Sequence, residues 1–473
     1  MNEFENVQQS DKAAGASRPD DSFHGHTSSG STRRSFLATS AAAGACGLVG
    51  LVAAGIANTS QAANAKPSAI GPVSSEPQAA GGDETIRPFH HHVPESEVID
   101  LRRRVAATRW PEPELVSDAT QGVQFATTQK LAHYWQTNFD WRKVEARMNA
   151  LPQFITNIDG LDIHFIHVRS KDPNALPVII THGWPGSIIE QMKVIDPLTN
   201  PTAHGGTAAD AFDVVIPSLP GYGFSGKPTA PGWDPDRIAS AWIVLMKRLG
   251  YTRYVAQGGD WGNCVTELMA LKAPPELLGM HTNMAATVPA DIDKMALAGA
   301  PPPSSFSPDE LRAYNQLVFF YAHGLGYAEE MANRPETLYG IADSPVGLAA
   351  WILDHDSASY ALIARVFDGQ TEGLTRDDIL ENVSLYWFTN TAVSSARLYW
   401  EYHGSFFEVR NVTIPVAVSA FPDEIYQAPK SWSEAAYPKL IYYNRPPKGG
   451  HFAAWEQPQS FSEELRAAFK SLR

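Results

Sequence analysis

The amino-acid sequence predicts an α/β protein with a mostly parallel sheet, a helical lead-in domain and a helix-rich insertion. Between positions 152 and 287, short apolar runs that end in Gly or Pro alternate with helical patterns, and strand signals return at 413–418 and 440–443. Such alternation is typical of a parallel sheet covered by helices on both faces. The chain has 473 residues, 44% of them hydrophobic, which supports a sizeable buried core.

The first 65 residues are predicted to be a targeting segment rather than part of the fold. Residues 1–30 are polar and lack apolar periodicity, so we expect them to be disordered. Arg33 and Arg34 precede a moderately apolar run at 41–57, and Ala63-Asn64-Ala65 fits a small-x-small cleavage site. Twin arginines before such a run are the address of the Tat export pathway. We expect a periplasmic or extracellular protein cleaved after Ala65; an uncleaved anchor or a chance arginine pair is the alternative.

A linker and a helical lead-in domain follow. Residues 66–85 are rich in Pro, Gly, Ser and Ala, which predicts a flexible linker. Residues 86–151 are predicted to form the lead-in domain. One helix begins at Asp100 and stops at Trp110-Pro111, because proline cannot continue a helix, and a second helix covers 125–138.

The sheet is predicted in two halves, 152–287 and 386–473. In the first half, 161–168 alternates with period two, which indicates a half-exposed strand, and 178–181, 214–217 and 254–257 are predicted as buried parallel strands. A helix with one apolar face covers 234–250. Residues 288–385, with many aromatic side chains and a Pro301-Pro302-Pro303 run, are predicted to form a helical lid over the active site.

Charge and cysteine content exclude several classes of partner and structure. The net charge of −14 argues against nucleic acid and anionic membrane as partners. Only Cys46 and Cys264 are present, and Cys46 lies in the predicted signal, so no intramolecular disulfide is expected.

The pattern Gly258-x-Asp260-x-Gly262 follows a predicted buried strand and precedes a predicted helix at 262–273. This is the setting of a nucleophile elbow, where glycines allow a tight turn that exposes the central side chain. A carboxylate in that position can attack saturated carbon without first losing a proton, and the resulting ester must then be hydrolysed. The alternative for the motif alone is an aspartate that caps the following helix.

The other members of a catalytic set follow in the expected chain order. Asp423 and Glu424 come after a predicted strand, and His451 lies in a Gly-Gly-His turn near the C-terminus. The order nucleophile, acid, histidine predicts that His451 activates water while a carboxylate holds its tautomer. The loop after strand 178–181 can supply a backbone N–H to an oxyanion hole, and Trp184 and Trp261 are the predicted donors.

Several longer segments resemble the microsomal epoxide hydrolase family. They are HGWPGS, PSLPGYGFS, QGGDWG, DSPVGLAAWILD, SSARLYWE, SAFPDEIYQAPKSW and GGHFAAWEQP, and DLRRRVAATRWP resembles that family's N-terminal domain. The resemblance covers the chain from about Ile86 to its C-terminus. It implies an α/β-hydrolase fold and the conversion of an epoxide and water to a vicinal diol through an aspartyl ester, and the many aromatic residues of the predicted lid suggest that the epoxide is apolar. It implies no metal and no organic cofactor.

The resemblance also implies roles for individual residues. The relay acid matches Glu424, with the adjacent Asp423 left as an alternative, and two lid tyrosines that hold the epoxide oxygen match Tyr399 and Tyr327. A phenol can donate a hydrogen bond, and then a proton, to the alkoxide that ring opening creates. Members of this family carry a membrane anchor, whereas this chain carries twin arginines, so membrane attachment is not transferred.

Other interpretations of the sequence are less consistent with it. A haloalkane dehalogenase also uses an aspartate and a histidine, but the tyrosine pair and the lead-in domain favour an epoxide. Asp260 disfavours a serine esterase, and the ordered catalytic set disfavours a non-catalytic binding protein. The run 221–226 matches G-x-G-x-x-G, but the prolines that follow prevent the helix of a dinucleotide site. His90-His91-His92 is predicted to be a surface run rather than a metal site.

Overall fold

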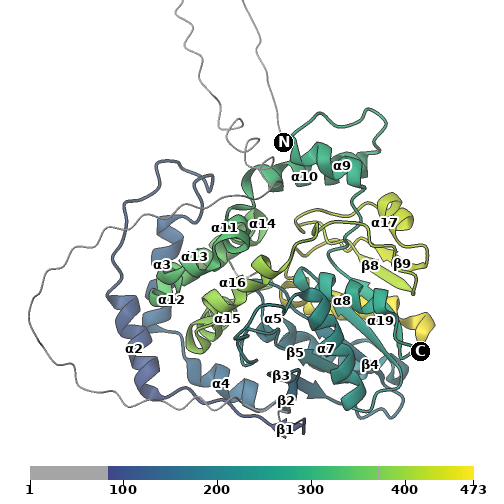
Figure 1. The fold of residues 1–473 in the computed structure, drawn as a ribbon. Helices are drawn as coiled ribbons and strands as arrows, with labels where there is room; N and C mark the ends of the chain where they lie inside the picture. Colours follow the sequence, from purple (N-terminus) through teal and green to yellow (C-terminus); the bar gives the residue numbers. More distant parts are fainter. Residues whose placement is uncertain (1–83, 371) are drawn as a thin grey trace, which may run out of the picture. The chain divides into compact units, whose positions relative to one another are not determined.

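The computed structural model describes residues 84–370 and 372–473, and within these ranges nine strands form one sheet (Figure 1). The strand order is β1-β2-β3-β5-β4-β6-β7-β8-β9. Pairs β1–β2, β2–β3 and β3–β5 are antiparallel, and every pair from β5–β4 to β8–β9 is parallel. The predicted linker, residues 66–85, and the predicted targeting segment lie wholly or almost wholly outside the described residues.

The predicted parallel strands are present with nearly the predicted bounds. They are β4 (Leu176–Thr181), β5 (Phe212–Pro217), β6 (Tyr254–Gly258), β8 (Val416–Ser419) and β9 (Leu440–Asn444). All residues of β4 and β6 are buried, so both faces of the sheet are covered at its centre. This burial explains why these strands have continuous apolar runs rather than alternating ones.

Three strands were not predicted. One is the two-residue strand β1 (Arg87–Pro88), which pairs with β2 at one edge of the sheet. Strand β2 (Gln153–Ile158) forms a hairpin with β3 (Leu161–Val168) through Asp159 and Gly160, which both have positive φ. Asp-Gly between two apolar runs is a strong hairpin signal, so the sequence did contain this information. Strand β7 (Leu277–Thr282) includes Gly279 and His281, which obscure its apolar pattern. His281 is buried and hydrogen-bonds the Ser419 hydroxyl at 2.9 Å.

The prediction that strand 161–168 is half-exposed was wrong. Its polar positions include His164, which is fully buried and hydrogen-bonds Ser218 Oγ and Gln153 Oε1, each at 3.0 Å. The ring of Phe89 contacts the His164 ring with the centroids 4.9 Å apart. The period-two pattern therefore arises from a buried polar network rather than from solvent on one face.

Helices flank the sheet in pairs. Helices α7 (Pro235–Arg248) and α8 (Trp261–Lys272) pack against each other, and α6 (Ile195–Thr199) packs against α19 (Pro458–Ala468). Asp234 caps α7 by accepting a hydrogen bond from the Arg237 N–H. The helix predicted for 234–250 is thus confirmed.

Three helices precede the sheet: α2 (Glu95–Ala106), α3 (Phe125–Thr137) and α4 (Trp141–Asn149). The structure begins α2 five residues before the predicted Asp100 and adds α4, which was not predicted. The buried Trp135 indole donates to Ser384 Oγ at 3.0 Å, and the Gln124 N–H donates to the Tyr360 hydroxyl at 2.8 Å. The lead-in helices therefore support the helices that follow the first half of the sheet.

A run of helices separates β7 from β8 (Figure 1). These are α9 (Ala290–Leu297), α10 (Pro308–His323), α11 (Gly326–Asn333), α12 (Tyr339–Asp343), α13 (Pro345–Leu353), α14 (Ser357–Phe367), α15 (Arg376–Thr389) and α16 (Ala392–Glu401). The lid end predicted at 385 falls inside α15. The domain boundaries themselves stay predictions. Within the described part of the chain, no helix is both long and apolar enough to cross a membrane.

A buried ion pair joins α8 to the segment that leads back into the sheet. Glu267 on α8 is fully buried and binds Arg410, whose side chain is 8% exposed. The Tyr437 hydroxyl also donates to Glu267, and Arg410 donates to the Tyr402 hydroxyl at 2.6 Å. Because a buried carboxylate is costly without partners, these contacts fix the position of the chain after α16.

We predict that Arg410→Met destabilises the protein by roughly 3–5 kcal/mol, because it leaves Glu267 buried without its counter-charge. The matched control is Lys130→Met, which breaks the ion pair with Asp368 at a site where both side chains are 51% exposed. That variant should lose less than about 1 kcal/mol. Urea unfolding of both variants measures the difference. Equal losses would show that the buried pair has no special structural role.

Candidate active site

Asp260 lies on a sharp turn between β6 and α8. Its backbone has φ 53° and ψ −131°, an uncommon conformation for a residue with a side chain. A Cβ at Gly262 would lie 2.0 Å from the Thr181 carbonyl oxygen, so no larger residue fits there. The predicted nucleophile elbow is therefore present in geometry, with glycine required by a close backbone approach.

The Asp260 carboxylate does not cap α8, so the alternative of a helix-capping aspartate is wrong. Instead, Asp260 Oδ1 accepts a hydrogen bond from the Trp184 N–H at 2.7 Å. Parallel pairing of β4 with β6 places Thr181 opposite Gly258, which brings the loop after β4 to the elbow. A Cβ at Gly183 would lie 2.2 Å from Asp260 Oδ1, so this loop approaches the carboxylate through a glycine.

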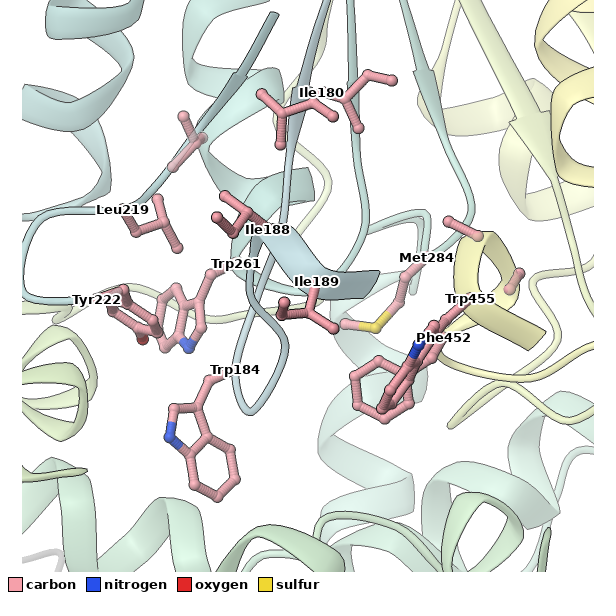
Figure 2. Packing of buried hydrophobic residues seen from close by; sticks show 14 of the residues in the cluster. Ile180, Trp184, Ile188, Ile189, Leu219, Tyr222, Trp261, Met284, Phe452 and Trp455 are labelled. Atoms are coloured by element: carbon pink, nitrogen blue, oxygen red, sulfur yellow. The ribbon is translucent and has the colours of Figure 1, made fainter. Parts of the chain in front are cut away.

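Of the two predicted oxyanion donors, one already binds Asp260 in the structure and the other has no such contact. The Trp184 N–H already points at the carboxylate, whereas Trp261 is the first residue of α8, directly after Asp260. The first amides of a helix have no partner inside it, so the Trp261 N–H is available for a ligand. Figure 2 shows Trp184 on the loop between Ile180 of β4 and Ile188 of α5 (Ile188–Gln191), within the apolar cluster below the strand ends. The role of Trp261 stays a prediction.

His451 is held by Glu424 rather than by Asp423. His451 Nδ1 lies 2.6 Å from Glu424 Oε1, and both residues are buried. Asp423 is exposed. A carboxylate can only accept, so Nδ1 carries the hydrogen and Nε2 faces away from Glu424. The Gly450 and Phe452 amides donate to Glu456 at 2.9 and 3.2 Å, which holds the His451 turn from both sides.

His451 Nε2 lies 3.8 Å from Asp260 Oδ2. Burial alone lowers the pKa of His451, but the charge of Glu424 and the hydrogen bond to it raise that pKa, and Asp260 and Asp356 add to the increase. The pKa of His451 is therefore raised overall, so its protonated, imidazolium form is favoured while Asp260 is ionised.

The two predicted tyrosines lie together on the lid side of Asp260. Tyr327 on α11 and Tyr399 on α16 have their ring centroids 6.0 Å apart. Tyr327 stacks on Trp184 at 4.8 Å, and Tyr399 meets Trp261 edge-on at 4.8 Å. Burial is the main cause that raises the pKa of each hydroxyl well above its ordinary range. The next cause is the charge of Asp260 for Tyr327, and the neighbouring Tyr327 for Tyr399. Both groups therefore remain protonated donors.

A cavity of about 380 Å³ contains Asp260, Tyr327 and Tyr399 in its wall. This volume is in the usual range for small-molecule sites. Much of the remaining wall is apolar, and its members include Met284, Leu297, Phe320, Leu325, Phe406 and Phe407.

The sequence reasoning missed one histidine in this site. His355 is buried, its Nδ1 lies 3.0 Å from Asp356 Oδ2, and its ring centroid lies 4.3 Å from that of His451. The run Asp354-His355-Asp356, directly after the apolar segment 345–353, was the available signal. In the described part of the chain, one group of side chains is arranged so that it could bind a cation. It consists of Asp260, His355 and His451, each of which has one oxygen or nitrogen atom within 4.8 Å of those of the other two.

The interpretation of 221–226 as a loop agrees with the structure, because no helix follows it until α7 begins at Pro235. His182 holds the loop after β4: its Nδ1 lies 2.9 Å from the Gly183 carbonyl oxygen, and its Nε2 accepts a hydrogen bond from the Leu219 N–H at 3.2 Å.

Comparison with known proteins agrees with this geometry. The family model for the epoxide hydrolase N terminus matches residues 86–191, and the model for the alpha/beta hydrolase fold matches residues 177–322. A putative epoxide hydrolase of Stigmatella aurantiaca is 50% identical over 396 residues, which cover 82% of this chain and 86% of that protein. Epoxide hydrolase 1 of Oryctolagus cuniculus is 36% identical over 403 residues, covering 81% and 88%. The chain is an epoxide hydrolase of the microsomal family.

Solved structures confirm the predicted α/β-hydrolase fold of this epoxide hydrolase. The crystal structure of juvenile hormone epoxide hydrolase from the silkworm Bombyx mori is 31% identical, with a TM-score of 0.73, covering 83% of this chain and 95% of that one. The Aspergillus niger epoxide hydrolase is 30% identical, with a TM-score of 0.69, covering 82% and 97%.

We predict that Glu424→Gln lowers kcat by roughly 10²–10⁴-fold, because the amide cannot stabilise imidazolium and permits the wrong histidine tautomer. Asp423→Asn is the matched control, and it should stay within about threefold of wild type because Asp423 is exposed and does not contact His451. Steady-state epoxide hydrolysis measures both. Loss of activity in the Asp423 variant alone would assign the relay acid to Asp423 instead.

Proposed function

We propose that this epoxide hydrolase converts an apolar epoxide to a vicinal diol through a covalent ester on Asp260. The observation that carries the proposal is the arrangement of the Asp260 carboxylate. One oxygen is held by the Trp184 N–H, and the other lies 3.8 Å from His451 Nε2. A carboxylate arranged in this way can serve as a nucleophile through Oδ2 and, once esterified, can develop oxyanion charge on Oδ1.

In the first half-reaction, Oδ2 of Asp260 attacks an epoxide carbon and the carbon–oxygen bond of the ring breaks. The ring oxygen then carries negative charge, which the hydroxyls of Tyr399 and Tyr327 neutralise by hydrogen bonding and proton donation. Their raised pKa values support this role, because neither tyrosine ionises before the epoxide arrives.

In the second half-reaction, water attacks the carbonyl carbon of the ester. Esterification removes the charge of Asp260, which is one of the charges that raise the His451 pKa. The His451 pKa therefore falls when the ester forms, and Nε2 becomes able to take a proton from water. Oxyanion charge on Oδ1 is stabilised by the Trp184 N–H, and we assign the Trp261 N–H as the second donor.

The apolar wall of the cavity supports an apolar substrate. The aliphatic and aromatic residues around Asp260 can bury hydrocarbon groups on the epoxide, and the charged residues of the same wall are Asp260, Asp293 and Glu329. A haloalkane could enter such a cavity too, but two hydroxyl donors suit an epoxide oxygen rather than a departing halide.

We predict diol formation from a panel of styrene oxide, cyclohexene oxide and 1,2-epoxyhexane by wild type and none by Asp260→Ala. Asp293→Asn is the control, since Asp293 lines the same cavity but is not part of the elbow, and it should retain diol formation. Haloalkanes are tested in parallel with halide detection. Halide release without diol would overturn the proposed reaction in favour of dehalogenation.

We also propose that the Tat pathway exports this enzyme. The support is the sequence Thr32-Arg33-Arg34-Ser35-Phe36-Leu37 before an apolar run, followed by the small residues at 63–65. These residues lie outside those that the structure describes.

We predict that replacing Arg33 and Arg34 by lysine keeps the full-length precursor in the cytoplasm of a Tat-competent host. The wild type should appear in the exported fraction with a new N-terminus at Lys66. Arg18→Lys, a change in the polar segment before the pair, serves as the control and should not affect export. Export of the double-lysine variant at the wild-type level would contradict the assignment.

A further inference from the structure

His355 is held in place by a residue with two structural tasks. Asp356 Oδ1 accepts from the Ser359 N–H at 2.8 Å and so caps α14, while Asp356 Oδ2 lies 3.0 Å from His355 Nδ1. Burial raises the pKa of Asp356, but the hydrogen bond and charge of His355, with the charge of His451, lower it to about 2. Asp356 is therefore a carboxylate that fixes the Nδ1–H tautomer of His355, as Glu424 does for His451.

The second nitrogen of His355 is buried and has no hydrogen-bond partner among residues 84–370 and 372–473. The side chain is 2% exposed, and its ring lies between those of His451, at 4.3 Å, and Tyr327, at 5.1 Å. A buried polar atom without a partner is costly, so this nitrogen calls for a ligand. The mechanism described above assigns it none.

The spacing of the polar atoms indicates what that ligand is. Polar atoms of Asp260, His355 and His451 all lie within 4.8 Å of one another. Hydrogen bonds of about 2.8 Å from one oxygen, at tetrahedral angles, separate their partners by about 4.6 Å. Atoms that all lie within 4.8 Å of one another, with His451 Nε2 3.8 Å from Asp260 Oδ2, are therefore close enough to share one bridging water molecule.

We propose that His355 is a second imidazole that holds the hydrolytic water against the Asp260 ester, an assignment that rests on the ester mechanism proposed above. In this assignment, Nε2 of each histidine accepts one hydrogen of the same water molecule. Its oxygen lone pair is then directed at the ester carbon of Asp260. Two fixed acceptors orient the water, where His451 alone would leave it free to rotate.

The chemical step is balanced without any other reactant. His451 takes one proton from water, the new oxygen–carbon bond forms at Cγ of Asp260, and the carbonyl electron pair moves to Oδ1. When the carbonyl re-forms, the Cγ–Oδ2 bond breaks, and the diol oxygen receives the proton from His451. His355 keeps its hydrogen bond to the water-derived oxygen and neither gains nor loses a proton. The second hydrogen of the water stays on that oxygen until the diol forms. The Asp260 carboxyl group then releases it, and it replaces the proton that the tyrosines gave to the ring oxygen, so Asp260 returns as a carboxylate.

The test separates ester formation from ester hydrolysis in His355→Phe, a variant that keeps a ring of similar size. The probe is whichever of styrene oxide, cyclohexene oxide and 1,2-epoxyhexane wild type hydrolyses fastest. Rapid quenching and intact-protein mass spectrometry follow the substrate-mass adduct during a single turnover. We expect ester formation within about threefold of wild type and ester hydrolysis roughly 10–100-fold slower, so that the adduct accumulates. His355→Gln, which retains a polar group, should recover part of the hydrolysis rate.

Ser359→Ala is the matched control. Ser359 lies on the same segment, its hydroxyl has no hydrogen-bond partner in the described part of the chain, and Asp356 caps α14 through the backbone N–H of Ser359, which alanine keeps. It should change neither rate. If His355→Phe does not fold, Asp356→Asn replaces it, since asparagine keeps the cap but removes the charge that orients His355; the same selective slowing of hydrolysis is expected.

Unchanged hydrolysis in these variants, or an equal fall of both rates with no rescue by glutamine, would overturn the assignment and leave His355 as a packing residue. Loss of wild-type hydrolysis on treatment with EDTA would also overturn it, in favour of a bound metal. His451→Gln is the reference that should trap the ester. If it forms no adduct, the ester mechanism itself fails, whatever the result at His355.

Discussion

The parallel pairing of β4 with β6 is the constraint on which the rest of the site depends. With Thr181 opposite Gly258, two loops leave neighbouring strand ends at the same level of the sheet. One loop carries Asp260 and the other carries the Trp184 N–H that binds it, and Gly183 and Gly262 permit the close approach. β8 and β9 follow in the same sheet, so Glu424 and His451 arrive at the same edge. A parallel sheet thus collects residues as far apart in the sequence as Trp184 and His451, 267 positions, into one site.

Burial gives these groups their chemistry. Glu424, Asp260 and Asp356 place negative charge around His451, and this outweighs the cost of burying the imidazolium. The same burial keeps Tyr327 and Tyr399 protonated on the lid side. When one carboxylate is consumed as an ester, the balance around the histidine changes in the direction that the next step needs. The lead-in helices contribute indirectly, because the contact of Trp135 with Ser384 supports α15, the helix that comes before α16 and its Tyr399 in the chain.

Most of the fold and the central part of the site could be predicted from the sequence because they depend on local patterns. The buried parallel strands have continuous apolar runs, and Asp260 stands between glycines at a strand-to-helix turn. Strand β7 could not be predicted because His281 and Gly279 break its pattern, and only the Ser419 partner explains the buried histidine. Only the tertiary structure could decide which of the neighbours Asp423 and Glu424 is the relay acid, because it buries Glu424 and leaves Asp423 exposed. His355 was missed because its proximity to His451 arises from packing of the lid, which no spacing in the sequence encodes.

A single turnover in heavy-oxygen water tests the covalent ester most directly. Enzyme in excess over epoxide is allowed one turnover, and the diol and the peptide that contains Asp260 are analysed by mass spectrometry. If Asp260 forms the ester, the diol oxygen comes from Oδ2, so the diol carries no label and the Asp260 peptide gains one heavy oxygen. A labelled diol with an unlabelled peptide would contradict the account, because water would then have attacked the epoxide directly.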